Sequence, residues 1–292
     1  MEDKKKCAAT TIRFVVGMVR QIRASVVDEH GNEVYPYIWN TTFLKLPKVR
    51  KKDMNRPSIT PDIMSGLAKI ANTFYRVLFI LLGATGMRIA EMLAVEIDKH
   101  ISADFRTITI NQQVHSGKVE NWTKTDSGTR QVDLHPAVSD ILKWFVGDRK
   151  SGFLFPGAWP GRPLGYTTVI RQLKKELKIL GYKNDFDEDL SAGTHIFRRF
   201  RITYLRNRAF CPPGLRHFWL GHSDGDDREE IRDVMGEWYD TSGSDRELRL
   251  EAAEKCGLGF DLPNDVPSVP KFPTLRRRLN QPRKRTRNQR VN

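Results

Sequence analysis

The sequence predicts a mainly α-helical protein with a small antiparallel β-sheet, an α+β fold. Apolar residues recur at helical spacing over several long segments. Three short runs rich in Thr, Val and Ile follow one another in the middle of the chain, separated by Ser-Gly and Asp-Ser-Gly. With 292 residues, of which 39% are hydrophobic, the chain is long enough for one large or two modest domains with a real core.

Helical periodicity and capping signals place the helices. Residues 8–27 form an amphipathic helix with arginines between its apolar positions. A second helical stretch begins at Thr60-Pro61-Asp62, which combines an N-cap, a proline at the first helical position and an acid in the first turn. It runs to about Val95, with breaks expected near Gly83 and Gly86. Further helices are predicted over 138–145, 167–180 and 194–206.

The β-rich part and the last helix are also marked by local signals. The runs 106–114, 118–124 and 129–134 predict a three-stranded antiparallel meander. The last helix begins at Ser244, where Ser244-Asp245-Arg246-Glu247 reads as a capping box, and Gly257 supplies its stop. We find no internal repeat.

Charge is distributed unevenly along the chain. The net charge is +14, and the last 22 residues hold nine Lys or Arg and no acid, which leaves +5 for the rest. A basic excess of this size favours a polyanionic partner, for which DNA, RNA and an acidic membrane surface are the candidates. We expect three regions: a helical region with a linker (1–50), a larger domain (58–262) and a basic, mobile C-terminal arm (263–292).

Several protein classes are excluded by missing signals. Cys7, Cys211 and Cys256 are odd in number and widely spaced, so we expect a reducing compartment, no disulfide framework and no zinc site. The N-terminus lacks a signal-peptide pattern, and the longest apolar run, 77–87, is too short to span a bilayer. Nucleotide-binding motifs and HExxH are absent. These observations predict a cytoplasmic protein with no membrane partner and no cofactor or metal.

Three segments place cations and histidines on otherwise apolar helices. Arg88 follows a glycine that can end a helix, and Glu91, three residues on, can hold its guanidinium. His195 and Arg198 share a helix face at spacing three. His222 follows Trp-Leu-Gly in a third segment. Two arginines and a histidine that converge on one point suit a phosphate, because guanidinium binds its oxygens in bidentate fashion.

In order and spacing, these segments resemble the tyrosine recombinase (phage integrase) family. The resemblance rests on ATGMRIAEMLAVE, TKTDSGTRQVDL, HIFRRFRITYLR, LRHFWLGHS and a late Tyr239, and it covers about residues 58–262. It implies a tyrosine recombinase-like catalytic domain in which six side chains act on one DNA phosphate. These catalytic candidates are Arg88, Lys124, His195, Arg198, His222 and Tyr239.

The chemistry of phosphodiester cleavage explains the need for such residue types. Fixed cations, here Arg88 and Arg198, stabilise the charge that gathers on the non-bridging oxygens. A tyrosine hydroxyl has a pKa near 10 and needs a base such as His195 to act as a nucleophile. The leaving 5′-oxygen needs a proton, which Lys124 can supply as general acid. A phosphotyrosyl ester keeps the energy of the broken bond, so strands rejoin without ATP.

The resemblance also implies partners. We expect double-stranded DNA as the substrate of a mobile-element integrase, a homotetramer on two duplexes, and accessory DNA-bending proteins as further candidate partners. The resemblance also implies that 58–262 is the catalytic domain and 1–50 a partial helical core-binding (DNA-binding) region. Only about one helix precedes the catalytic part, where family members normally carry a complete core-binding domain. Two other functions therefore stay open: a truncated DNA-binding remnant without recombination activity, and DNA relaxation of the type IB topoisomerase kind. An RNA-binding protein lacks support in the motifs.

Single residues within the predicted site have competing interpretations. Lys118 competes with Lys124 for the role of general acid, and Tyr204 is an internal alternative to Tyr239 as nucleophile. Arg199 and Arg201 are expected to touch flanking phosphates or solvent. Ser223–Asp233, rich in acids, reads as a surface insertion ahead of the tyrosine.

Overall fold

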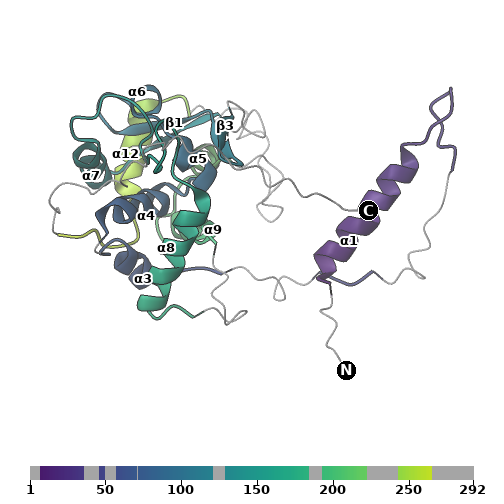
Figure 1. Cartoon of the computed structure of the whole chain (residues 1–292), viewed down its shortest axis with the longest axis horizontal. Coiled ribbons are helices and arrows are strands. Elements are labelled where there is room, and N and C mark those ends of the chain that lie inside the picture. The colour runs from purple at the N-terminus through teal and green to yellow at the C-terminus, as the bar shows by residue number, and fades with distance from the viewer. Residues whose placement is uncertain are drawn as a thin grey trace, which may run out of the picture. The chain divides into compact units, whose positions relative to one another are not determined.

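The computed structural model describes residues 7–35, 46–49, 57–70, 72–120, 129–183, 193–221 and 243–264. Backbone contacts divide the chain into two compact units, Met1–Arg56 and Pro57–Asn292. The predicted fold class is confirmed, since the described part of the larger unit is mainly helical with short antiparallel strand pairs (Figure 1). Its helices are α3 (Pro61–Leu67), α4 (Thr73–Thr85), α5 (Ile89–Ala94), α6 (Ile97–His100), α7 (Pro136–Val146), α8 (Tyr166–Ile179), α9 (His195–Asn207), α10 (Pro213–Leu220) and α12 (Arg246–Cys256).

The smaller unit contains the predicted amphipathic helix, α1 (Ala9–Ala24). All of its side chains are at least partly exposed. Arg13 Nε donates to the carbonyl of Pro47, and Arg23 donates to the carbonyl of Tyr35, so two of its basic residues hold the chain that follows.

The caps predicted for the second helical stretch are confirmed, with one correction. The Thr60 hydroxyl accepts from the N–H of Ile63 at the start of α3. Helix α4 ends at Gly86, which adopts the left-handed conformation (φ 67°) that only glycine takes without strain. The break expected near Gly83 is wrong, because α4 continues through it. A Cβ there would lie 2.6 Å from Cε of Met64, so Gly83 lets α3 and α4 pack closely.

The predicted three-stranded meander is wrong in part: the first and second runs do pair, but the strands do not form one sheet. The described residues form two separate antiparallel pairs, β1 (Thr107–Ile110) with β4 (Arg130–Asp133) and β2 (Gln113–His115) with β3 (Lys118–Glu120). The single run expected over 106–114 divides at Gln112, whose side-chain amide donates to the carbonyl of Ala94 at 2.6 Å and to Glu96. Side-chain bonds to the end of α5 thus turn the chain before it can continue one strand.

The later helices follow the predicted ranges closely. Helices α7, α8 and α9 cover the three predicted segments with shifts of one or two residues. The final helix also forms and ends at Gly257, as expected, but its N-cap is Asp245 rather than Ser244. The Asp245 carboxylate accepts from the N–H of Leu248 at 3.0 Å. A carboxylate in this position also complements the positive end of the helix dipole.

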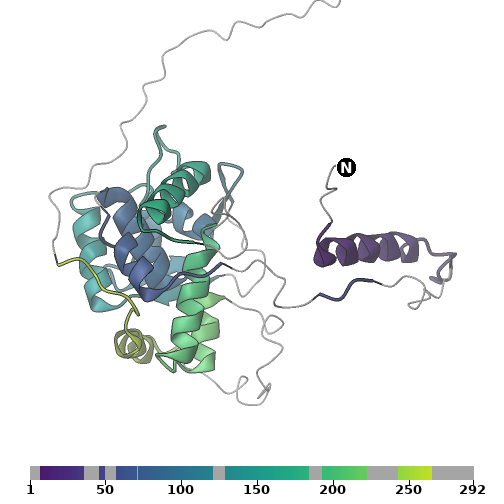
Figure 2. The same cartoon turned by 90° about the horizontal axis from the view of Figure 1, so that it is seen from below.

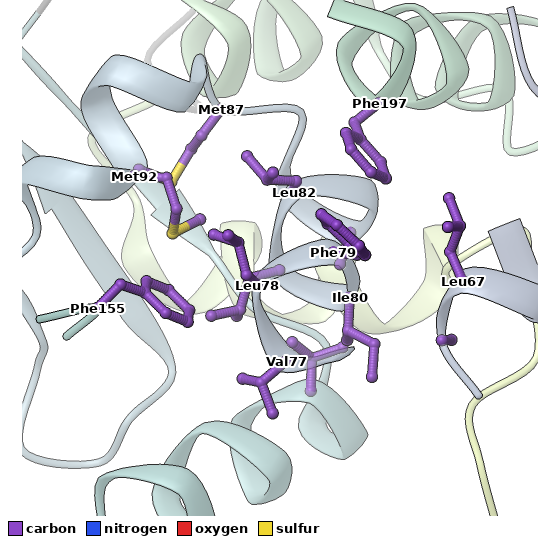
Figure 3. Packing of buried hydrophobic residues seen from close by; sticks show 14 of the residues in the cluster. Leu67, Val77, Leu78, Phe79, Ile80, Leu82, Met87, Met92, Phe155 and Phe197 are labelled. Atoms are coloured by element: carbon purple, nitrogen blue, oxygen red, sulfur yellow. The ribbon is translucent and has the colours of Figure 1, made fainter. Parts of the chain in front are cut away.

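The hydrophobic core surrounds α4, which lies in the middle of the larger unit (Figure 1). Its residues from Val77 to Leu82 are all buried, so the helix packs on every side. Phe79 stacks on Phe197 of α9, with ring centroids 5.4 Å apart (Figure 3). This packing fixes α9 against α4 and sets where the charged residues of α9 meet the end of α4. Among the described residues, no helix is both long and apolar enough to cross a membrane.

Candidate active site

The turn between α4 and α5 positions Arg88. Its backbone N–H donates to Glu91 Oε2 at 2.8 Å, and its guanidinium Nη1 donates to Glu91 Oε1 at 3.0 Å. The bond from the Arg88 backbone N–H to the Glu91 side chain is one of the two bonds of a capping box at the start of α5. The Arg88 side chain stays 42% exposed while Glu91 is buried, so the guanidinium is fixed by its partner and still faces solvent.

Glu91 has a second, fully buried partner in Arg130 of β4. The two guanidinium Nη atoms of Arg130 donate to the two carboxylate oxygens at 3.2 and 2.8 Å. Burial alone would raise the pKa of Glu91, but the charge and hydrogen bonds of Arg130, with the N–H and charge of Arg88, hold that pKa below its usual value. Glu91 is therefore a carboxylate shared by two arginines.

Arg198 ties α9 to the ends of two other helices. Its guanidinium donates from Nη1 to the carbonyl of Gly86 at 3.0 Å, and from Nη2 to the carbonyl of Leu220. The last carbonyls of a helix have no partner within the helix and carry the negative end of its dipole. Arg198 satisfies such carbonyls after α4 and in α10, and these bonds hold its buried guanidinium in one orientation.

Arg130 likewise donates a hydrogen bond to a backbone carbonyl at the end of α10. Arg130 Nε donates to the carbonyl of Trp219 at 2.8 Å. The chain then turns at Gly221, which is left-handed (φ 60°), and a Cβ on Gly221 would lie 2.8 Å from Arg130 Nη1. Both its conformation and its contact with Arg130 require glycine at the residue just ahead of His222.

His195 begins α9, where the charges of Arg88 and Arg198 act on it. The residue is exposed, unlike the neighbouring Arg198. Partial desolvation lowers the pKa of His195, and the charges of Arg199, Arg198 and Arg88 lower it further. The neutral imidazole is therefore the favoured form near pH 7, and this form can accept a proton.

The structure brings together three of the six predicted site residues, Arg88, His195 and Arg198. The other three, Lys124, His222 and Tyr239, lie outside the described residues. Lys118, the competing general acid, is an exposed residue of β3. Within the described part of the chain, no group of three or more His, Cys, Asp or Glu side chains could hold a metal ion.

One expectation about α9 needs correction. Arg201 does not reach solvent, because it is buried and donates to the carbonyl of Gly257 at 2.7 Å. Burial lowers its pKa to about 10. Arg199 is partly exposed and donates to the carbonyl of Pro57 at 2.8 Å, so its expected contact with flanking phosphates or solvent stays a prediction. Tyr204, the alternative nucleophile, donates its hydroxyl to the carbonyl of Cys256 at 2.9 Å and stacks on Phe200.

Sequence reasoning missed two buried arginines that organise this region. Arg130 is the first, and Arg249 of α12 is the second. Arg249 donates to Asp133 Oδ2 at 2.8 Å, to Gln131 Oε1 and to the carbonyl of Gly243 at 2.6 Å. The Trp219 indole donates to the same Asp133 oxygen at 2.9 Å. A signal existed in TRQVDL, where two charged residues interrupt an otherwise β-forming run.

Comparison with solved structures shows the class to which the fold belongs. The Tn1549 transposon integrase, solved in complex with a circular intermediate DNA, is 18% identical with a TM-score of 0.53, over 75% of this chain and 73% of that one. The integrase from mycobacterium phage Brujita is 17% identical with a TM-score of 0.51, over 90% of this chain and 77% of that one. No protein-family model and no curated protein matches the chain.

The chain thus has the fold of tyrosine recombinase catalytic domains. The predicted resemblance to that family is confirmed in its fold.

The shared carboxylate gives a prediction about stability. Glu91→Gln should lower the free energy of unfolding by about 3–5 kcal/mol, because it leaves the buried charge of Arg130 without a counter-charge. Urea unfolding at pH 7 measures the change. Because folding lowers the pKa of Glu91, its contribution is present above the unfolded-state pKa of about 4.3 and is lost as the pH falls through the folded-state value.

A matched control is Glu251→Gln, which removes one partner of an exposed ion pair with Lys255 and should cost less than about 1 kcal/mol. The double variant Glu91→Gln with Arg130→Met should recover part of the lost stability. Equal stability of Glu91→Gln and the wild type would contradict the shared-carboxylate arrangement.

The position of His195 gives a second prediction. Its pKa, measured by NMR titration of the ring protons, should lie below 6.5, and Arg199→Ala should raise it by removing a nearby positive charge. Arg206→Ala serves as control. Arg206 lies about 16 Å further along α9, which is more than the Debye length of about 8–10 Å, so salt screens its charge from His195. A pKa of 6.5 or above in the wild type would remove the physical basis for a neutral base here.

Proposed function

We propose that this protein is a site-specific recombinase that cleaves and rejoins double-stranded DNA through a covalent 3′-phosphotyrosine. The observation that carries the proposal is the convergence of Arg88, His195 and Arg198 around the ends of α4 and α10, each arginine held by buried partners. The shared fold with integrases solved on DNA supports the substrate class.

The arginines supply preorganised positive charge. Arg88 and Arg198 would bind the non-bridging oxygens of the scissile phosphate, where charge increases in the transition state. Their orientation is set before DNA binds, since Glu91 holds one and two backbone carbonyls hold the other. Little reorganisation is then needed during the reaction, which is what makes such charge catalytic rather than merely attractive.

Proton transfers would be divided between two groups. Neutral His195 accepts the proton of the Tyr239 hydroxyl as that oxygen attacks phosphorus. Lys124 protonates the departing 5′-oxygen, and His222, which follows the Gly221 turn, adds a hydrogen bond to the phosphate. The bond from phosphorus to the 5′-oxygen breaks as the phosphotyrosyl bond forms, and the reverse reaction with a new 5′-hydroxyl rejoins the strand.

The partners follow from this chemistry. We propose double-stranded DNA as the substrate, a homotetramer on two duplexes as the recombining assembly, and accessory DNA-bending proteins at sites that need them. The positive charge of the chain, +14, would drive the phosphate contacts.

Covalent trapping tests the nucleophile. The protein is mixed with nicked duplexes drawn from the DNA that flanks its own gene, denatured in SDS and examined for a protein–DNA adduct. Tyr239→Phe should abolish the adduct and leave DNA affinity nearly unchanged, because only the attacking hydroxyl is lost. Tyr204→Phe is the matched control and should keep the adduct. Arg198→Lys should slow adduct formation by about 10²–10³-fold, since one preorganised donor group is altered.

The outcomes separate the three functions. An adduct that depends on Tyr239 and joins two duplexes supports the recombinase. An adduct accompanied by relaxation of supercoiled DNA that carries no paired site favours a type IB topoisomerase activity. Salt-sensitive binding with no adduct favours the DNA-binding remnant, and equal loss of adduct and affinity in Tyr239→Phe would overturn the nucleophile assignment.

The general acid is tested through the leaving group. Lys124→Ala should slow adduct formation on normal DNA but not on DNA with a 5′-bridging sulfur, because a thiolate leaves without being protonated. Lys118→Ala should behave like the wild type on both substrates. Arg198→Lys should remain slow on both, which separates charge stabilisation from proton transfer. If Lys118→Ala were slow on normal DNA and regained its rate on the sulfur-containing DNA, while Lys124→Ala did not, Lys118 would be the general acid instead.

A further inference from the structure

Two buried cysteines lie together away from the proposed active site. Cys211 is in the connection between α9 and α10, and Cys256 is the last residue of α12; their exposed fractions are 4% and 6%. Figure 2 shows the yellow-green α12 next to the green helices α9 and α10. The two cysteines belong to one small apolar cluster, completed by Leu205, Leu215, Trp219 and Ala253.

The two thiols interact, and both backbones are bonded to the end of α9. The Cys211 and Cys256 thiols shift each other's pKa, and the Cys211 thiol donates to the carbonyl of Pro212 at 3.7 Å. The N–H of Cys211 donates to the carbonyl of Leu205 at 2.9 Å, and the carbonyl of Cys256 accepts from the Tyr204 hydroxyl at 2.9 Å. Both cysteines, which are distant in sequence, are thereby held beside the end of α9 in one apolar cluster.

The surroundings favour a reactive thiolate at Cys256. The interaction with Cys211 lowers the pKa of Cys256 to about 7, against the opposing effect of burial, and the charge of Arg201 lowers it further. The same interaction and burial raise the pKa of Cys211. One sulfur is therefore prepared as a nucleophile beside a second thiol that can resolve its oxidised form.

We propose that Cys211 and Cys256 form a reversible disulfide site whose oxidant is hydrogen peroxide. The Cys256 thiolate attacks the peroxide, the O–O bond breaks, and a sulfenic acid forms while hydroxide leaves and takes up a proton. Cys211 then attacks the sulfenic sulfur, the S–O bond breaks, and water leaves as the S–S bond forms. Two electrons pass from the thiols to the peroxide, and a reducing thiol reverses the bond by exchange.

The bond would join the α9–α10 connection to the end of α12. The closed loop contains α10 and all of α12. A crosslink across such a loop restricts the unfolded chain, so the oxidised protein should melt at a higher temperature than the reduced one. This inference is independent of the proposed recombinase activity, because neither cysteine takes part in that mechanism.

Peptide mapping of the full-length chain tests the site. Cys7→Ser removes the exposed third thiol, and the protein is treated with hydrogen peroxide or left reduced, alkylated, and digested with trypsin without reduction. The expected product is a crosslink between peptides 209–216 and 256–271, each of which holds one cysteine. The intact mass should fall by two hydrogen atoms, the melting temperature should rise, and dithiothreitol should reverse both changes.

Matched variants decide between this site and nonspecific oxidation. Cys7→Ser with Cys211→Ser should gain oxygen atoms on Cys256 and show no rise in melting temperature. Formation of the crosslink only after denaturation in urea would overturn the proposal, as would oxygen addition at either cysteine of the Cys7→Ser protein without the crosslinked peptide. Mapping needs only the Cys7→Ser protein, so the test does not depend on the folding of the double variant.

Discussion

The carboxylate of Glu91 is the interaction on which the proposed site depends. It lies in the interior, where a charge is costly unless it is paired and hydrogen-bonded. Arg130 supplies the buried partner, and Arg88 supplies a second one that reaches solvent. Each arginine thus fixes the position of the other through the oxygens they share. One buried carboxylate thus holds both arginines in place, and Arg88 still presents its positive charge to solvent.

The second constraint is the set of helix ends that meet near Gly86 and Gly221. Carbonyls at the end of a helix lack partners, and buried arginines bind them from other elements. Arg198 binds the carbonyls of Gly86 and Leu220, and Arg130 binds that of Trp219. The two arginines and the turn ahead of His222 therefore form a connected unit, so a shift in one element changes the charge geometry of the whole site.

A parallel network fixes α12. Asp133 accepts from both Arg249 and Trp219, and Arg249 also donates to the carbonyl of Gly243. The proposed nucleophile, Tyr239, belongs to the stretch of sequence between Gly221 and Gly243. Buried arginines contact the backbone or the turn at each of these two glycines. The described chain on either side of this stretch is thus fixed by buried arginines of the larger unit.

Local sequence determined the features that depend on near neighbours. The Thr60 cap, the end of α4 at Gly86, and the spacing of three that links Arg88 to Glu91 and His195 to Arg198 could all be predicted, because each involves residues within one helical turn. Tertiary structure alone decided that β1 pairs with β4, that Arg130 binds Glu91 and that Arg201 is buried. These contacts join residues far apart in sequence, and the free energy of burying a charge is set by partners that no local pattern identifies.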